Sequence, residues 1–132
     1  MIKVLLISID QKIKLFVTNS YNNSNYQFIT FNSTKDPLDI MSQICSFNPS
    51  ILILDDDFVS PISVHLLSSL KKVNPKLSII FLTSNTSLEL GRNINSIGVK
   101  HYLIKPISEI EFKEYLNSLF KAKENINYYP IN

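Results

Sequence analysis

Five short runs of apolar residues, separated by longer segments with helical patterning, constrain the fold of this sequence more than any other feature. Three of the runs are nearly continuous in Val, Ile, Leu and Phe, which is typical of strands in a parallel sheet that helices cover on both faces. The second run is more polar and suits a strand near the edge of the sheet. The predicted strands are Lys3–Ile7, Tyr26–Phe31, Ile51–Leu54, Ser78–Leu82 and His101–Ile104.

The segments between these runs carry helix start and stop signals. Asp36–Pro37 and Ser60–Pro61 each put a capping residue just before a proline, which is favoured at the first helical position. Thr86–Glu89 and Ser108–Glu111 have the spacing of capping boxes, in which a hydroxyl and a carboxylate each satisfy a free backbone N–H. Gly98 is placed to end the helix that starts near Thr86, because glycine readily adopts the left-handed conformation found there.

Strands that alternate with helices in this way predict an α/β domain with a doubly wound (βα)5 sheet. We expect the domain to span residues 1–122. Residues 123–132 are predicted to be a C-terminal tail or the start of a linker, because Asn125, Asn127 and Pro130 interrupt the helical pattern.

Composition excludes several classes of protein. With 132 residues, of which 45% are hydrophobic, the chain can bury the core of one domain. A net charge of +2 and a charged fraction of 18% do not indicate a nucleic-acid-binding domain. The most basic stretches, Lys71–Lys72 and the three lysines at positions 113, 121 and 123, are interpreted as solvated helix faces.

The chain shows no sign of export or membrane insertion. The apolar run that ends at Ile7 is too short for a signal peptide, and no window is long enough to span a membrane. The single cysteine, Cys45, cannot form an internal disulfide, and it is predicted to be a buried thiol near Ile40 and Ile44. We therefore expect a cytoplasmic protein.

Nucleotide enzymes of this architecture are largely excluded by the scarcity of glycine. The only glycines are Gly91 and Gly98, so no glycine-rich phosphate loop can follow the first strand. A flavodoxin-like electron carrier is disfavoured for the same reason. His65 and His101 have no Cys or Asp partners at metal-ligand spacing and are interpreted as structural or surface residues.

Polar residues follow the predicted strands at their carboxyl ends. Because those ends meet at one edge of a parallel sheet, we expect the side chains to converge there. A carboxylate that accepts phosphate, with a hydroxyl and an ammonium to bind the new oxygens, would suit an acyl phosphate. The segments concerned are Ser8–Asp10, Asp55–Asp57, Thr83–Ser84 and Lys105–Pro106.

With these features the sequence resembles the receiver domains of two-component response regulators over roughly residues 2–121. The segment Gly98–Pro106 is similar to the family's glycine-to-Lys-Pro segment without a gap. Pro49–Asp55 resembles the strand that leads to the phosphoacceptor, and Ile79–Ser84 resembles the strand that ends in the switch hydroxyl.

The resemblance implies a role for each matching residue. Asp55 would accept a phosphoryl group from a histidine kinase or a phosphotransfer protein, and Lys105 would pair with the acceptor and then with a phosphoryl oxygen. Thr83, with Ser84 beside it, would bind the phosphoryl group, and Tyr102 would rotate inward with Thr83.

The resemblance also implies a cis peptide before Pro106. It further implies a signalling face made by the helix that starts near Thr86, the strand His101–Ile104 and the helix that starts near Ser108. This face would dock a downstream protein or a second copy of the chain. Such a domain is a regulatory phosphoacceptor, not an enzyme, apart from its own phosphorylation and dephosphorylation, and it would contact neither membrane nor nucleic acid itself.

The sequence departs from the family where Mg²⁺ is held. The family ends its first strand with two adjacent acids, and those positions here are Ser8 and Ile9. Since a hard dication prefers carboxylates, we expect a weakened Mg²⁺ site, with Asp55, Asp57 and Asp10 as the candidate ligands.

These candidates have alternative interpretations. The capping role of Asp10 at the next helix is favoured over metal binding. Asp57 and its neighbour Asp56 are as well explained as solvated loop acids, and Asp56 is expected to point away from the site. Tyr102 is as well explained by core packing. The two competing functions are a phosphorylated receiver and a phosphorylation-independent pseudo-receiver that acts as a protein-interaction module.

Overall fold

The computed structural model describes residues 1–20 and 25–128. It forms a five-stranded sheet with strand order β2-β1-β3-β4-β5, in which all neighbouring strands are parallel. The strands are β1 (Ile2–Ile7), β2 (Tyr26–Phe31), β3 (Ile51–Asp55), β4 (Ser78–Thr83) and β5 (His101–Ile104). The helices are α1 (Gln11–Thr18), α2 (Pro37–Phe47), α3 (Asp56–Val59), α4 (Ser63–Val73), α5 (Leu88–Ile97) and α6 (Glu109–Tyr128). The predicted doubly wound fold is confirmed.

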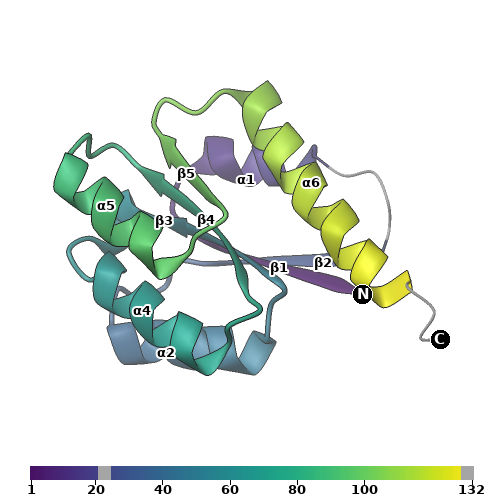
Figure 1. The fold of residues 1–132 in the computed structure, drawn as a ribbon, viewed down its shortest axis with the longest axis horizontal. Coiled ribbons are helices and arrows are strands. Elements are labelled where there is room, and N and C mark those ends of the chain that lie inside the picture. The colour runs from purple at the N-terminus through teal and green to yellow at the C-terminus, as the bar shows by residue number, and fades with distance from the viewer. Residues whose placement is uncertain (21–24, 129–132) are drawn as a thin grey trace.

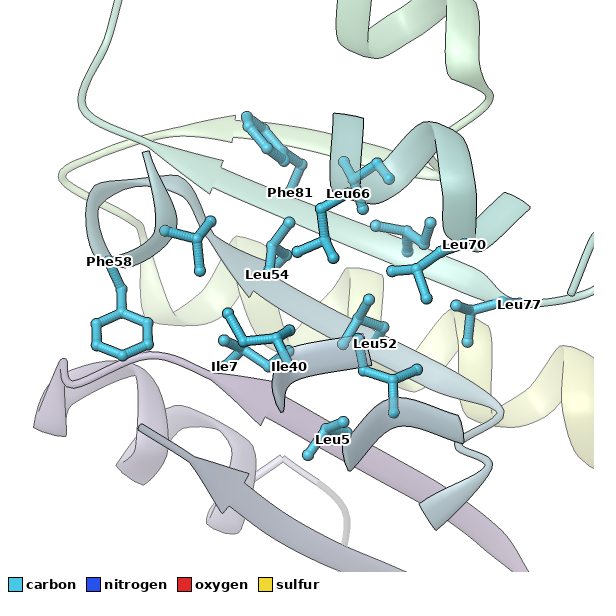
Figure 2. Close-up of a cluster of buried hydrophobic side chains, with 14 of the residues drawn as sticks. Leu5, Ile7, Ile40, Leu52, Leu54, Phe58, Leu66, Leu70, Leu77 and Phe81 are labelled. Carbon is cyan, nitrogen blue, oxygen red and sulfur yellow. The ribbon is translucent and has the colours of Figure 1, made fainter. Parts of the chain in front are cut away.

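Helices cover both faces of the sheet, as Figure 1 shows: α1 and α6 lie on one face, and α2, α4 and α5 lie on the other. The core accordingly has two halves. One half, drawn in Figure 2, joins alternate strand residues such as Leu5 and Leu52 to Leu66 and Leu70 of α4. The other half joins the strand residues that point to the opposite face, such as Val4, to α1 and α6. Because side chains on both faces of the sheet are buried under helices, the central strands have almost no polar residues.

The strands agree closely with the sequence patterns. The bounds of β2 and β5 are as predicted, and the other three strands differ by a residue at one end. The more polar β2 is an edge strand, as expected. Gly98 ends α5 in a left-handed conformation with φ of 98°, which confirms its predicted role.

Helix starts agree less well. Asp36 caps α2 as predicted, but α5 is capped by Ser87, one residue after Thr86. Ser60 does not cap α4, which begins at Ser63. Ser60 instead ends the short helix α3 by donating its backbone N–H to Asp56 O, and the Ser60–Pro61 peptide is cis.

Two further expectations are wrong. Cys45 is exposed, because it lies one position after Ile44 and the helical turn of about 100° per residue carries it off the face that Ile40 and Ile44 bury. The helix α6 continues to Tyr128 through Asn125 and Asn127, whose moderate cost in helix propensity does not stop it. Pro130 lies outside the described residues, and the domain boundary at 122 stays a prediction.

Candidate functional site

The candidate site lies at the carboxyl edge of the sheet, where β1, β3, β4 and β5 end. The structure brings Asp55 and Lys105 into direct contact there, with 2.9 Å between the carboxylate and the ammonium. The backbone N–H of Lys105 donates to the carbonyl of Thr83, which ties the ends of β4 and β5 together. Three segments that are distant in the sequence thus meet at one point, because parallel strands present their carboxyl ends together.

Asp55 is the last residue of β3 and is only 1% exposed. Its Oδ2 atom accepts hydrogen bonds from the Ser8 hydroxyl at 2.6 Å and from the Lys105 ammonium at 2.9 Å. Its Oδ1 atom accepts from the backbone N–H of Asp57 at 3.1 Å. The carboxylate is therefore buried with one cation and two neutral donors around it, which is how a charge becomes tolerable in an interior.

Lys105 is surrounded by three carboxylates. Besides Asp55, its ammonium lies 3.2 Å from Asp57 and 3.6 Å from Asp10. Partial burial acts to lower the pKa of Lys105, but the hydrogen bonds and charges of Asp55 and Asp57 outweigh it and leave that pKa above its ordinary value. The lysine is therefore held as a cation by the site itself.

Asp57 binds Ser84 with both carboxylate oxygens. One oxygen accepts from the Ser84 backbone N–H at 3.0 Å and the other from its hydroxyl at 2.5 Å. Partial burial acts to raise the pKa of Asp57, yet the bonds from Ser84 and the charge of Lys105 more than offset this and keep the pKa below its ordinary value. Asp57 thus links the end of β4 to the lysine.

Asp56 forms a second, buried network beside the first. It is 5% exposed and accepts hydrogen bonds from the hydroxyls of Thr83, at 2.7 Å, and of Ser63. The alternative interpretation of Asp56 as a solvated loop acid is therefore wrong. Its expected place on the other side of the chain from Asp55 is confirmed, because Asp56 lies on the sheet face that α4 covers. The Thr83 hydroxyl, which the resemblance implies would move to bind the phosphoryl group, is bonded to Asp56 in this structure.

Solved structures of other proteins share the fold of this chain, whereas the two sequence comparisons find no match. No family model matches the sequence, and no curated protein matches it closely enough to indicate a relative. A response regulator receiver domain from Clostridium thermocellum has a TM-score of 0.73 and 22% identity, covering 96% of this chain and 99% of its own. The response regulatory domain of mrkE from Klebsiella pneumoniae has a TM-score of 0.77 and 20% identity, covering 94% of this chain and 99% of its own.

A Francisella response regulator receiver domain gives the same result, with a TM-score of 0.71, 24% identity and coverage of 93% of this chain and 99% of its own. The chain has the receiver fold. Since each of these identities is below 25%, the roles of individual residues rest on the geometry of the site and not on the comparisons.

Within the receiver fold, Tyr102 lies next to the second network. Its ring is half-buried and stacks on Phe81, with 5.4 Å between ring centroids. Desolvation, and then the charge of Asp56, raise the pKa of the Tyr102 hydroxyl above its ordinary value. The ring therefore packs in the core and also lies within electrostatic reach of the acid that holds Thr83. The peptide between Lys105 and Pro106 is cis, the geometry that the resemblance implied.

The end of β1 differs from the family's pattern in the way the sequence predicts. Ser8 is buried and binds Asp55, while Ile9 is 62% exposed and contributes no ligand atom. Asp10 caps α1 by accepting from the backbone N–H of Lys12, which agrees with the favoured interpretation. The Ser8 hydroxyl also accepts from the Asp10 backbone N–H, so it joins the end of β1 to the start of α1.

The residues at this edge do not fit a Mg²⁺ ion as they are arranged. A dication requires several oxygens directed at one point, and the point among Asp10, Asp55 and Asp57 is taken by the Lys105 ammonium. Within residues 1–20 and 25–124, no group of three or more His, Cys, Asp or Glu side chains is placed to hold a metal ion. A metal would therefore have to displace the lysine.

Proposed function

We propose that this chain is a receiver domain of two-component signalling in which Asp55 accepts the phosphoryl group. One observation carries the proposal: in a receiver fold, the carboxylate that ends β3 is bound by a lysine that follows β5, at 2.9 Å. An acid paired with a fixed cation at the functional edge of a doubly wound sheet suits a regulatory phosphoacceptor. On this proposal the chain is not an enzyme in the ordinary sense.

The hydrogen bonds indicate which oxygen of Asp55 attacks. Oδ2 already accepts from two donors, Ser8 and Lys105, whereas Oδ1 accepts only from the backbone of Asp57. A carboxylate oxygen has two lone pairs in its plane, so Oδ1 keeps one for a new bond. In the proposed transfer this oxygen bonds to phosphorus, the bond from phosphorus to the donor's imidazole nitrogen breaks, and that nitrogen takes up a proton from water.

The neighbours of Asp55 supply the electrostatic part of the reaction. The Lys105 ammonium, 2.9 Å from Asp55, neutralises charge that develops on the phosphoryl oxygens. The Thr83 hydroxyl can reach the phosphoryl group only after it releases Asp56. Because Asp55 is 1% exposed, the donor can reach it only when the side chains around it move apart. Phosphorylation is thereby coupled to a rearrangement of this edge.

On this proposal α5, β5 and α6 form the surface that transmits the signal to a partner. Each of these elements exposes a large apolar side chain: Leu88 is 76% exposed, Ile104 is 46% exposed and Ile110 is 72% exposed. A partner docked on these elements would remove such apolar side chains from water, which favours binding. We propose that this face binds a downstream protein or a second copy of the chain.

The donor on this proposal is a histidine kinase or a phosphotransfer protein, and the place of action is the cytoplasm. Among the described residues no helix is both long enough and apolar enough to cross a membrane. Nothing in the proposed transfer requires nucleic acid to contact this domain.

Intact-mass analysis after incubation with acetyl phosphate tests the proposal. We expect the mass of one phosphoryl group to be added to the wild type and to an Asp10→Asn variant, and not to an Asp55→Asn variant. The samples are run with and without Mg²⁺. If the wild type gains no mass under either condition, the proposal fails and the pseudo-receiver becomes the better account.

A further inference from the structure

A basic groove lies at the opposite edge of the sheet from Asp55. It is a cavity of about 860 Å³ beside the amino ends of β4 and β5, between the C-terminal end of α4 and residues 118–123 of α6. Its lining contains the lysines 71, 76, 100 and 123 together with apolar side chains that include Leu77 and Leu119. Of the described residues that line the groove, none is acidic.

The lysines reach the groove from separate elements and two of them are fixed in place. Lys71 of α4 donates to the carbonyls of Leu77, at 2.8 Å, and of Pro75. Lys123 of α6 donates to the carbonyl of Lys76 at 3.0 Å. The helices α4 and α6 lie on opposite faces of the sheet (Figure 1), so the short segment 75–77 holds an ammonium from each side.

These cations repel one another without a compensating acid in the lining. Burial, and then the charge of Lys100, lower the pKa of Lys71, and burial with the charges of Lys100 and Lys71 lowers that of Lys123. Burial and Lys100 also lower the pKa of His101, which lines the same groove. Lys100 therefore acts on every one of these groups, and an anion placed among them would relieve the repulsion.

We propose that this groove binds a small molecule that carries two or more phosphate groups. Its volume is within the range of roughly 300–1,000 Å³ that is usual for small-molecule sites. Lysines from two helices and from the loops before β4 and β5 suit several phosphate oxygens at once, whereas one monoanion could match only part of the charge. The apolar lining gives a surface for the uncharged part of the ligand, such as a nucleoside.

The groove is separate from the proposed phosphoacceptor site. The two lie at opposite ends of β3, whose residues Ile51 and Asp55 are four steps of ~3.3 Å apart, or roughly 13 Å. No residue is shared between the lining of the groove and the network around Asp55. The inference therefore does not depend on phosphorylation and can be tested apart from it.

The test is a two-dimensional amide NMR titration of the full chain at about 0.15 M salt. The probes are tripolyphosphate, ATP, inorganic phosphate and adenosine. We expect tripolyphosphate and ATP to shift amides of Ser50, of residues 76–78 and of residues 98–101, with saturation. Inorganic phosphate should bind more weakly, and adenosine alone should give no saturable shift.

Matched variants decide whether the groove is the site. Lys100→Gln should weaken ATP binding about tenfold, the change that corresponds to ~1.4 kcal/mol. Lys72→Gln removes the same charge from an exposed position beside Lys71 that does not line the groove, and it should leave the affinity unchanged. Equal effects of the two variants, absence of saturable shifts, or tighter binding of a single-stranded DNA oligomer than of ATP would each overturn the proposal.

Discussion

Asp55, Asp56 and Asp57 are consecutive in the chain, yet each carboxylate is stabilised in a different way. Asp55 is paired with a cation, Asp56 accepts from two buried hydroxyls, and Asp57 accepts from Ser84 at the surface and shares the cation. The division follows from the backbone: Asp55 ends a strand, and the next residue begins the helix α3. These separate environments lead us to expect three measurable effects, on the buried network, on acid stability and on the competition between lysine and metal.

The first concerns the buried network of Asp56. In Asp56→Asn one carboxylate oxygen becomes an amide NH₂, so either Thr83 or Ser63 loses the acceptor for its hydroxyl. We expect the free energy of unfolding to fall by about 1–3 kcal/mol, measured by urea denaturation. Asp57→Asn, at the more exposed neighbour, is the control and should cost less. If the two variants lose the same stability, the Asp56 network is not a stabilising element.

The second concerns acid stability. Because folding lowers the pKa of Asp57, its stabilising effect is complete above the pKa of the unfolded chain, about 3.9, and is lost as the pH falls through the lower folded value. We expect the stability difference between wild type and Asp57→Asn to be constant near neutral pH and to shrink below about pH 4. Urea midpoints measured from pH 7 to pH 2.5 check this, and a difference that grows in acid would contradict it.

The third concerns the competition between lysine and metal. Lys105→Met removes the ammonium from among three carboxylates, whose mutual repulsion then favours any dication. We expect 5–10 mM Mg²⁺, roughly the range in which weak sites respond, to raise the melting temperature of this variant more than that of the wild type. Lys113→Met, which removes a lysine paired with Glu109, is the control. An equal response of all three proteins would show that the ammonium does not occupy the place of a metal.

The side of the chain on which Asp56 lies was predictable, but its burial was not. If the strand continued, residue 56 would point to the other face from Asp55. Asp56 does lie on that other face, where Thr83 of β4 and Ser63 of α4 cover it and donate hydrogen bonds to it, and no local sequence pattern indicates these contacts. The capping role of Asp10 was predictable because it depends only on the residues that follow it.

At the scale of whole elements, apolar patterning determines the helices and strands more firmly than their ends. The final helix shows this, because Phe112, Leu116 and Phe120 are fully buried at helical spacing while Ile110 is 72% exposed. Helix starts are less predictable, since several hydroxyl residues often lie close together. Thr86 and Ser87 are adjacent candidates, and in the structure it is Ser87 that accepts from the backbone N–H of Leu90.

This difference between faces of α6 gives a stability prediction. Leu116→Ala leaves a cavity between α6 and the sheet and should lower the free energy of unfolding by about 2–5 kcal/mol. Ile110→Ser, on the exposed side of the same helix, should change it by less than about 0.5 kcal/mol. Chemical denaturation of the two variants measures both effects. A large loss for Ile110→Ser would mean that this side chain serves the fold and not a partner.

At the scale of the whole molecule, the net charge is only +2, but charges of opposite sign are concentrated at opposite edges of the sheet. Acids gather at the carboxyl edge of the sheet, where Asp55 lies, and lysines gather at the amino edge, where Lys71 and Lys123 lie. The sequence interpretation of these two lysines as solvated helix faces is wrong, since both are half-buried in the groove. Such a cluster cannot be seen in the sequence, because its members come from separate elements.

Both charged edges arise from one property of the fold, the parallel arrangement of the strands. It brings all carboxyl ends to one edge and all amino ends to the other, so a residue's place in the strand decides which end it joins. The doubly wound fold and the meeting of Asp55 with Lys105 at one edge were therefore accessible from the alternation of strands and helices, and the receiver fold from the resemblance to that family. The bonding of Thr83 to Asp56 and the grouping of lysines required coordinates.

The most direct test of the central claim is to locate the acyl phosphate after reaction with acetyl phosphate. Borohydride reduces an aspartyl phosphate to homoserine, and peptide mass mapping then identifies the residue that carried the group. The account predicts homoserine at position 55 alone. Homoserine at position 10, 56 or 57, or at none of the four, would contradict the assignment of Asp55 as the phosphoacceptor.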